Sequence, residues 1–80
     1  ELAYEALKIK KSAPTILNAA NEIAVDAFLS NKIKYLSIPK LVEKTLNKAS
    51  FSNINSIKEV LEIDKNSRQI ATSMVISGKY

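Results

Sequence analysis

The stretch from Ile16 to Ser30 limits the possible folds more than any other part of the sequence. Wound as an α-helix at about 100° per residue, its apolar side chains cover roughly 240° of the circumference. A surface helix needs a much narrower apolar stripe, so this pattern predicts a central helix with neighbours on several sides. Close approach by those neighbours is favoured by four alanines: Ala19, Ala20, Ala24 and Ala27.

The segments on either side of this stretch also follow a helical pattern, and none shows convincing alternation with a period of two residues. Residues 1–10 carry an apolar stripe of their own. Ser12 and Pro14 then indicate a new helix start, with serine as N-cap and proline in the first turn, where its missing N–H matters least. That central helix is expected to run to about Ser30.

A second start of the same kind is predicted at Ser37-Ile38-Pro39. It leads into a helix with a one-sided apolar stripe and a charged opposite side. The stripe consists of Ile38, Leu41, Val42, Thr45, Leu46 and Ala49. The opposite side consists of Lys40, Glu43, Lys44, Asn47 and Lys48.

The last third of the chain begins with a polar connection, residues 50–55, in which Phe51 and Ile54 are expected to plug the core. Ser56 to Glu59 fits a capping box and opens a short helix, with Ile57, Val60 and Leu61 inward. An unbroken extension would point Asp64 and Arg68 into the core. We therefore expect a break near Asp64 and a final helix capped by Gly78, with Ile70, Ala71, Met74 and Val75 inward.

These elements predict an all-α fold: a small bundle of four to five short helices around a central helix near residues 13–30. Residues 1–80 are expected to form a single domain. The sequence begins at Glu1, without methionine and inside a helical pattern, so we expect a domain cut from a longer polypeptide. No signal peptide is recognisable, and no apolar run reaches the roughly 20 residues of a membrane span.

Composition removes most classes of catalytic chemistry. The chain has no cysteine and no histidine, which are the usual thiolate nucleophile, imidazole base and transition-metal ligands. Its one glycine, Gly78, stands at the end, whereas Rossmann and P-loop phosphate sites need several. We therefore expect no catalytic, cofactor-binding or metal-binding residue within these 80 residues.

Four polar residues of the central helix are the candidates for a functional site. Asn21 falls in the middle of the apolar arc and Asn18 between two apolar positions, so both are expected to be buried and bonded to loop carbonyls or helix ends. A catalytic or ligand-binding role and simple exposure are the alternatives. Glu22 and Asp26, four residues apart, could form half of a carboxylate metal site or an ordinary solvated acidic edge.

The net charge of +4 leaves nucleic-acid binding open. The helix at residues 13–30, followed by the one at Ser37, superficially resembles a helix-turn-helix with Lys40, Lys44 and Lys48 as phosphate contacts. The connection is about twice the tight turn of that motif, and no arginine stands on the supposed recognition helix. A DNA binder is therefore a weaker alternative than an independent helical protein-interaction module.

Several motifs, in order along nearly the whole chain, resemble one enzyme family. They are LAYEAL at 2–7, SAPTILNAANEIAV at 12–25, AFL at 27–29, Ile38-Pro39, and Val60-Leu61 with Asp64 and SRQIA at 67–71. Together they are similar to the C-terminal region of 1-deoxy-D-xylulose 5-phosphate reductoisomerase, and LNAANE is the most specific of them.

The resemblance implies a parent enzyme that converts 1-deoxy-D-xylulose 5-phosphate to 2-C-methyl-D-erythritol 4-phosphate in non-mevalonate isoprenoid biosynthesis. It implies NADPH, Mg²⁺ or Mn²⁺, and a homodimer. The family's cofactor, metal and phosphate residues lie upstream, and none maps onto this sequence. The segment is thus expected to be a non-catalytic support for the catalytic domain, without nucleic acid or membrane as partner. The abundance of lysine and asparagine suggests a plastid-type organelle, with the bacterial cytoplasm as the alternative.

Overall fold

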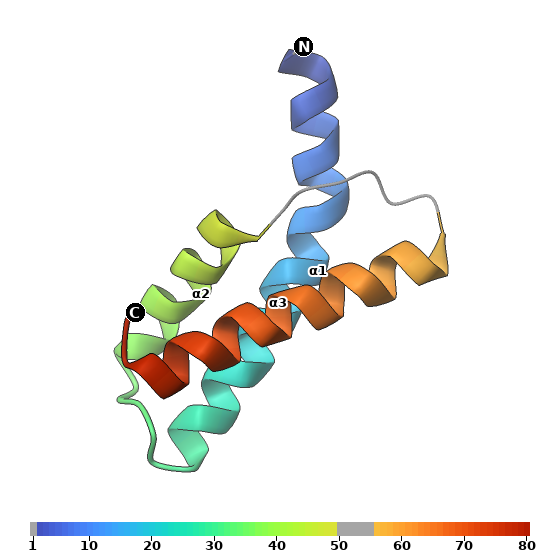
Figure 1. The fold of residues 1–80 in the computed structure, drawn as a ribbon. Coiled ribbons are helices and arrows are strands. Elements are labelled where there is room, and N and C mark those ends of the chain that lie inside the picture. Colours follow the sequence, from blue (N-terminus) through green and yellow to red (C-terminus); the bar gives the residue numbers. More distant parts are fainter. Residues whose placement is uncertain (1, 50–55) are drawn as a thin grey trace.

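The computed structural model describes residues 2–49 and 56–80, which form three α-helices: α1 (Leu2–Leu29), α2 (Ser37–Lys48) and α3 (Ile57–Ser77). α3 crosses α1, and each helix contacts the other two (Figure 1). The predicted all-α class is confirmed. The predicted number of four to five helices is wrong for the described residues, because two expected breaks do not occur. The predicted plugs Phe51 and Ile54 lie outside the described residues.

The first expected break lies at Ser12 and Pro14, where α1 instead runs on with the proline inside it. An interior proline removes one backbone hydrogen bond and bends or breaks a helix, at a cost of about 3 kcal/mol. Figure 1 shows α1 changing direction along its length. Ser12 and Ile16, on either side of the proline, are both fully buried. Tertiary packing on both sides of Pro14 therefore outweighs the local stop signal, and Ser12 is not an N-cap.

The second expected break lies at Asp64, where α3 continues without interruption. Asp64 and Arg68 do not enter the core, because both lie at the margin of the helix packing and pair with each other at 2.8 Å. The continuous helix has one buried stripe, Ile63, Ser67, Ala71 and Met74. That stripe leaves Ile57 and Leu61 on another side, 79% and 62% exposed, so their predicted inward positions are wrong.

The helix ends follow their local signals more closely. Ser56 is the N-cap of α3, and its Oγ accepts a hydrogen bond from the Glu59 backbone N–H at 3.3 Å. Gly78 adopts the left-handed conformation (φ 72°) and its N–H bonds the carbonyl of Met74. Both caps are as predicted. α2 starts at the predicted place, but its N-cap is Leu36, which makes no side-chain cap bond.

α2 packs by the stripe that its sequence predicts. Leu41, Thr45 and Ala49 are buried, while Ile38, Val42 and Leu46 are half-buried. All five residues of the predicted opposite side, Lys40, Glu43, Lys44, Asn47 and Lys48, are exposed.

The core sits where α2 and α3 close on the alanines of α1. Ala24 and Ala27 belong to a buried cluster with Leu41, Ala71 and Met74. A second cluster joins Ile16 of α1 to Ala49 and Ile63, and Ile70 packs against both clusters. The buried hydroxyls of Thr45 and Ser67 each donate to the carbonyl four residues earlier, at 2.8 Å. These two buried polar groups are thus satisfied within their own helices.

The turn after α1 also has a recognisable cause. Asn31 adopts the left-handed conformation (φ 61°), which asparagine tolerates better than most residues. The N–H of Lys32 bonds the carbonyl of Ala27, and the N–H of Asn31 bonds that of Phe28, forming a Schellman motif. Beyond the turn, the ring of Tyr35 meets that of Phe28 edge to face, with 5.7 Å between the ring centroids.

Among the described residues, no helix combines the length and the apolar character that crossing a membrane requires.

The close packing around the α1 alanines yields a direct test. Ala24→Leu should destabilise the chain by about 1–3 kcal/mol, because the added carbons must fit beside Leu41 and Ala71 in an already filled core. Lys44→Leu, on the solvated side of α2, should change stability by less than about 0.5 kcal/mol. Urea unfolding followed by circular dichroism measures both. Equal midpoints for the two variants would contradict this account of the core.

Candidate functional site

The candidate polar residues of α1 lie on its surface. Asn18, Asn21, Glu22 and Asp26 are all exposed, so the predicted burial of the two asparagines is wrong. From Ser12 onward, the buried side of α1 is narrower than the apolar arc of the sequence and consists of Ser12, Ile16, Ala19, Ala20, Ala24 and Ala27. α2 and α3 cover that side, and the adjacent flank with the asparagines is left uncovered by the described part of this chain.

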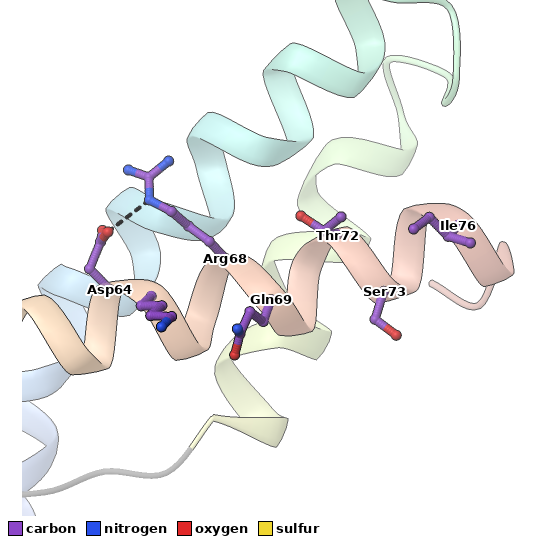
Figure 2. Close-up of a pocket in the computed structure, with 7 residues that line it drawn as sticks. Asp64, Arg68, Gln69, Thr72, Ser73 and Ile76 are labelled. Carbon is purple, nitrogen blue, oxygen red and sulfur yellow. Dashed lines mark hydrogen bonds and ion pairs between the residues drawn. The ribbon is translucent and has the colours of Figure 1, made fainter.

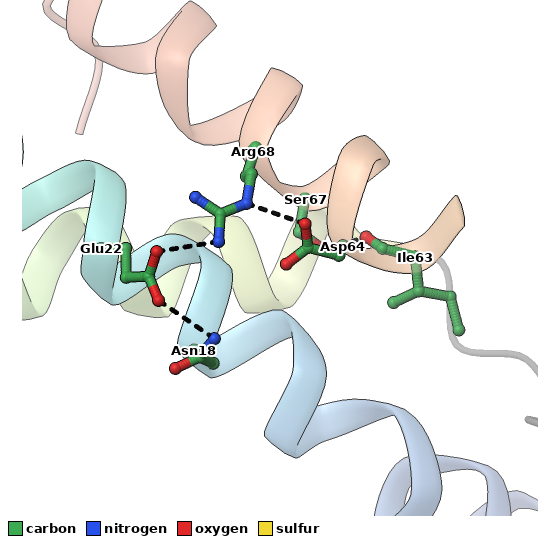
Figure 3. A network of polar contacts seen from close by, with 6 residues as sticks. All are labelled: Asn18, Glu22, Ile63, Asp64, Ser67 and Arg68. Carbon is green, nitrogen blue, oxygen red and sulfur yellow. Dashed lines mark hydrogen bonds and ion pairs between the residues drawn. The ribbon is translucent and has the colours of Figure 1, made fainter. Parts of the chain in front are cut away.

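A chain of polar contacts crosses from α1 to α3 on this flank (Figure 3). The Asn18 Nδ2 donates to Glu22 Oε2 at 3.3 Å, within α1. The Arg68 guanidinium then donates from Nη2 to Glu22 Oε1 at 2.9 Å and from Nε to Asp64 Oδ2 at 2.8 Å. Glu22 is therefore engaged through both carboxylate oxygens, and Arg68 ties two helices together.

The two carboxylates hold Arg68 in its charged form. Hydrogen bonds from Arg68 to Asp64 first, and to Glu22 second, raise the pKa of the guanidinium above its ordinary value. Such a group stays protonated throughout the working pH range and cannot act as a base. Its side chain is 34% exposed and that of Glu22 is 55% exposed, so solvent screens the pair. The network orients the side chains more than it stabilises the fold.

The donor set does not fit a metal ion or a nucleotide phosphate. Within residues 12–49 and 56–80, no three carboxylates come close enough together to hold a metal. No third carboxylate of those residues lies close enough to Glu22 and Asp26 to complete a metal site, and Glu22 is engaged by Arg68 and Asn18. The single glycine caps α3 and has no phosphate-binding loop around it.

A broad hollow of about 600 Å³ runs along α3 (Figure 2). Its lining residues are Asp64, Lys65, Arg68, Gln69, Thr72, Ser73 and Ile76. Because all of them belong to one helix, the hollow is an open helix surface rather than an enclosed substrate pocket. Its shape therefore does not indicate a small-molecule site on α3.

Sequence reasoning missed the link between α1 and α3. Two signals pointed to it: Arg68 is the one arginine beside eleven lysines, and Asp64 stands four residues before it, the spacing of a helical ion pair. The partner on α1, Glu22, is 46 residues away. Pairing at that separation depends on how the helices pack, which local spacing does not encode.

The fold and the site together define a small all-helical domain in which a polar network links two of the described helices. The comparisons identify it further: residues 1–70 match the family described as DXP reductoisomerase C-terminal domain, and the chain belongs to that family. The resemblance of the LNAANE region and its flanking motifs is thereby confirmed.

Two curated relatives illustrate the match. The 1-deoxy-D-xylulose 5-phosphate reductoisomerase of Desulforamulus reducens is 47% identical over 74 residues, which are 92% of this chain and 19% of the relative. That of Acinetobacter baumannii is 47% identical over 76 residues, 95% of this chain and 19% of the relative. This chain therefore spans about a fifth of the length of the relatives that it matches.

A solved structure shares this fold. It is the 1-deoxy-D-xylulose 5-phosphate reductoisomerase from Zymomonas mobilis in complex with NADPH, with a TM-score of 0.75 and 45% sequence identity. The alignment covers 78% of this chain and 16% of that one.

The contact between Glu22 and Arg68 should be measurable as a small coupling. A double-mutant cycle with Glu22→Gln and Arg68→Met should give about 0.2–1 kcal/mol at low salt and less at high salt. Urea unfolding of the four proteins supplies the free energies. The control cycle pairs Arg68→Met with Glu62→Gln, an exposed residue of α3 six positions away, and should show no coupling. Equal coupling in both cycles would contradict the geometry of Figure 3.

Proposed function

We propose that this chain is the non-catalytic C-terminal support domain of a 1-deoxy-D-xylulose 5-phosphate reductoisomerase. The parent enzyme would convert 1-deoxy-D-xylulose 5-phosphate to 2-C-methyl-D-erythritol 4-phosphate with NADPH, in isoprenoid biosynthesis. The observation that carries the proposal is the family match over residues 1–70, supported by relatives about five times as long that bear this enzyme name.

The cofactors belong to the remainder of the parent polypeptide in this proposal. NADPH is supported by the Zymomonas mobilis relative, which was solved in complex with it, and Mg²⁺ or Mn²⁺ and the homodimer by the resemblance of the motifs. The described residues of this chain fit neither cofactor, because they lack histidine, cysteine, a carboxylate cluster and a glycine loop. No chemical step is therefore assigned to this chain.

The role that remains for the domain is mechanical. A helical bundle docked on the catalytic part can hold it rigid while a lid or cofactor domain moves against it. The uncovered flank of α1 provides a surface for such docking. The packing of α2 and α3 on the buried alanines of α1 fixes the three described helices relative to one another.

The relatives bear on where the parent enzyme works. Those described above are bacterial, which favours the bacterial cytoplasm over the plastid-type organelle that the lysine- and asparagine-rich composition suggested. We therefore propose a bacterial cytoplasm, the alternative that the sequence left open, as the compartment of the parent enzyme.

An independent interaction module and a DNA binder are the competing functions. The family match argues against both, since it accounts for nearly the whole chain. For DNA binding the exposed Lys40, Lys44 and Lys48 of α2 would be the phosphate contacts. A salt-dependent mobility shift with mixed-sequence duplex would favour that alternative.

Removal of the domain tests the supporting role. The parent enzyme truncated before this segment should lose solubility, melt at a lower temperature or turn over more slowly, because the catalytic part loses its support. The isolated segment should oxidise no NADPH in the presence of substrate and metal. Absorbance of NADPH and thermal melting supply the measurements. A truncated enzyme with full stability and turnover would refute the proposal.

Substitution of the exposed carboxylates tests whether the domain takes part in chemistry. In the full-length parent, Glu22→Gln and Asp26→Asn should change the KM for NADPH and for the metal by less than about twofold, or about 0.4 kcal/mol. Glu43→Gln on the outer side of α2 is the matched control. A rise of tenfold or more in either KM for Glu22→Gln or Asp26→Asn alone would place a ligand on this domain and contradict the assignment.

A further inference from the structure

One flank of α1 is exposed and carries both apolar and amide side chains. We call it the α1 outer face: Leu17, Asn18, Asn21, Glu22 and Val25, which recur at helical spacing. Leu17 is 40% exposed and Val25 is 37% exposed, and the three polar members are exposed as well. The face contains most of the LNAANE motif, whose two alanines point the other way into the core.

The distribution of charge separates this face from the solvated side of α2. No lysine or arginine occurs between Ser12 and Asn31, although the chain has eleven lysines. The solvated side of α2 carries Lys40, Lys44 and Lys48 within nine residues. Protein interfaces are depleted of lysine and enriched in arginine, and the single arginine, Arg68, lies beside the α1 outer face.

The face is also hollowed where α1 meets α3. A depression of about 380 Å³ is lined by Asn21, Glu22, Ile23, Val25, Asp26 and Arg68. A smaller one of about 190 Å³ continues from Ile23 and Asp26 to Thr72 and Val75 of α3, with Lys32 at its edge. The seam between the two helices thus offers apolar side chains, flanked by polar groups, to an incoming surface.

The polar groups of the seam retain unused hydrogen-bonding capacity. A guanidinium has five N–H donors, and Arg68 uses one at Nε and one at Nη2, so three remain. Glu22 and Asp64 hold this side chain in place, which reduces the entropy that a partner contact would cost. The amide of Asn21 lines the same depression.

We propose that the α1 outer face and the adjoining seam dock on the preceding, catalytic part of the same polypeptide, a proposal that rests on the proposed function. The relatives extend for about four-fifths of their length beyond the region matched here, so a large partner surface is available in the parent. Around the seam, the three carboxylates of Glu22, Asp26 and Asp64 outnumber the two cations of Arg68 and Lys32. The matching surface is therefore apolar, with amide or basic groups around it.

The same charges argue against a second copy of the domain as the occupant. A twofold-symmetric contact through this face would set the patch against itself and bring Glu22 and Asp26 near their own counterparts. Like charges placed together at an interface cost several kcal/mol. The outer surface of α3 is a weaker docking candidate, because its open hollow is lined by one helix and includes Lys65.

Cysteine labelling in the full-length parent tests the docking face. Asn21→Cys and the matched control Lys44→Cys replace exposed helical residues, and turnover of each variant confirms that it is folded. Each rate of maleimide labelling, located by peptide mass spectrometry, is divided by the rate at the same site in urea. The normalised rate at position 21 should be at least about tenfold lower than at position 44, the ratio that a docking free energy of about 1.4 kcal/mol produces. Equal normalised rates would overturn the proposal.

A photo-crosslinker attached to the cysteine at position 21 identifies what covers the face. A product of single-chain mass, joined to an upstream peptide, is the expected result. A product of two-chain mass would overturn the choice of occupant in favour of a second copy. Failure here is distinguishable from failure of the proposed function: loss of stability on truncation together with equal labelling rejects this face and leaves the supporting role intact.

Discussion

Close approach at the α1 alanines is the constraint on which the rest of the structure depends. Ala19, Ala20 and Ala24 are completely buried, and Ala27 nearly so. Because these side chains are small, larger ones from the other helices, such as Leu41 and Met74, can pack directly against α1. Such efficient packing matters in a chain of 80 residues without cysteine, because a chain of this length buries a comparatively small share of its surface and no disulfide can stabilise it.

The parts of the fold that sequence reasoning predicted correctly are those determined by local signals. The amphipathic stripe of α2, the Ser56 cap and the Gly78 cap each involve residues at most eleven positions apart. The two wrong breaks also came from local signals, at Pro14 and at Asp64. There the packing of residues far apart in sequence decides the outcome: burial of Ser12 and Ile16 carries α1 through its proline, and pairing with Arg68 keeps Asp64 out of the core.

The wrong burial of Asn18 and Asn21 has a different cause. The wide apolar arc of α1 predicts contact with other helices of the same bundle. Within the described part of this chain, however, α2 and α3 cover one side and leave Leu17 and Val25 partly exposed. If the catalytic part of the parent covers that flank, the arc correctly indicated a helix surrounded on several sides, and the error lay in assigning all of its neighbours to 80 residues. The family match and the share of the relatives covered supply the missing context.

Docking would also explain the polar network of Glu22, Arg68 and Asp64, which contributes little to the stability of the isolated domain. An exposed pair such as Glu22 and Arg68 adds little stability, since solvent screens it and ordering two long side chains has an entropic cost. At a surface that becomes covered, the same arrangement has two effects. Glu22 and Asp64 neutralise the guanidinium charge of Arg68, which would otherwise be desolvated alone, and the fixed guanidinium presents its remaining donors in one orientation. A domain without a metal-binding cluster in its described residues and without a phosphate loop can thus still be specific, through the shape and hydrogen-bonding pattern of a surface that can dock on another part of an enzyme.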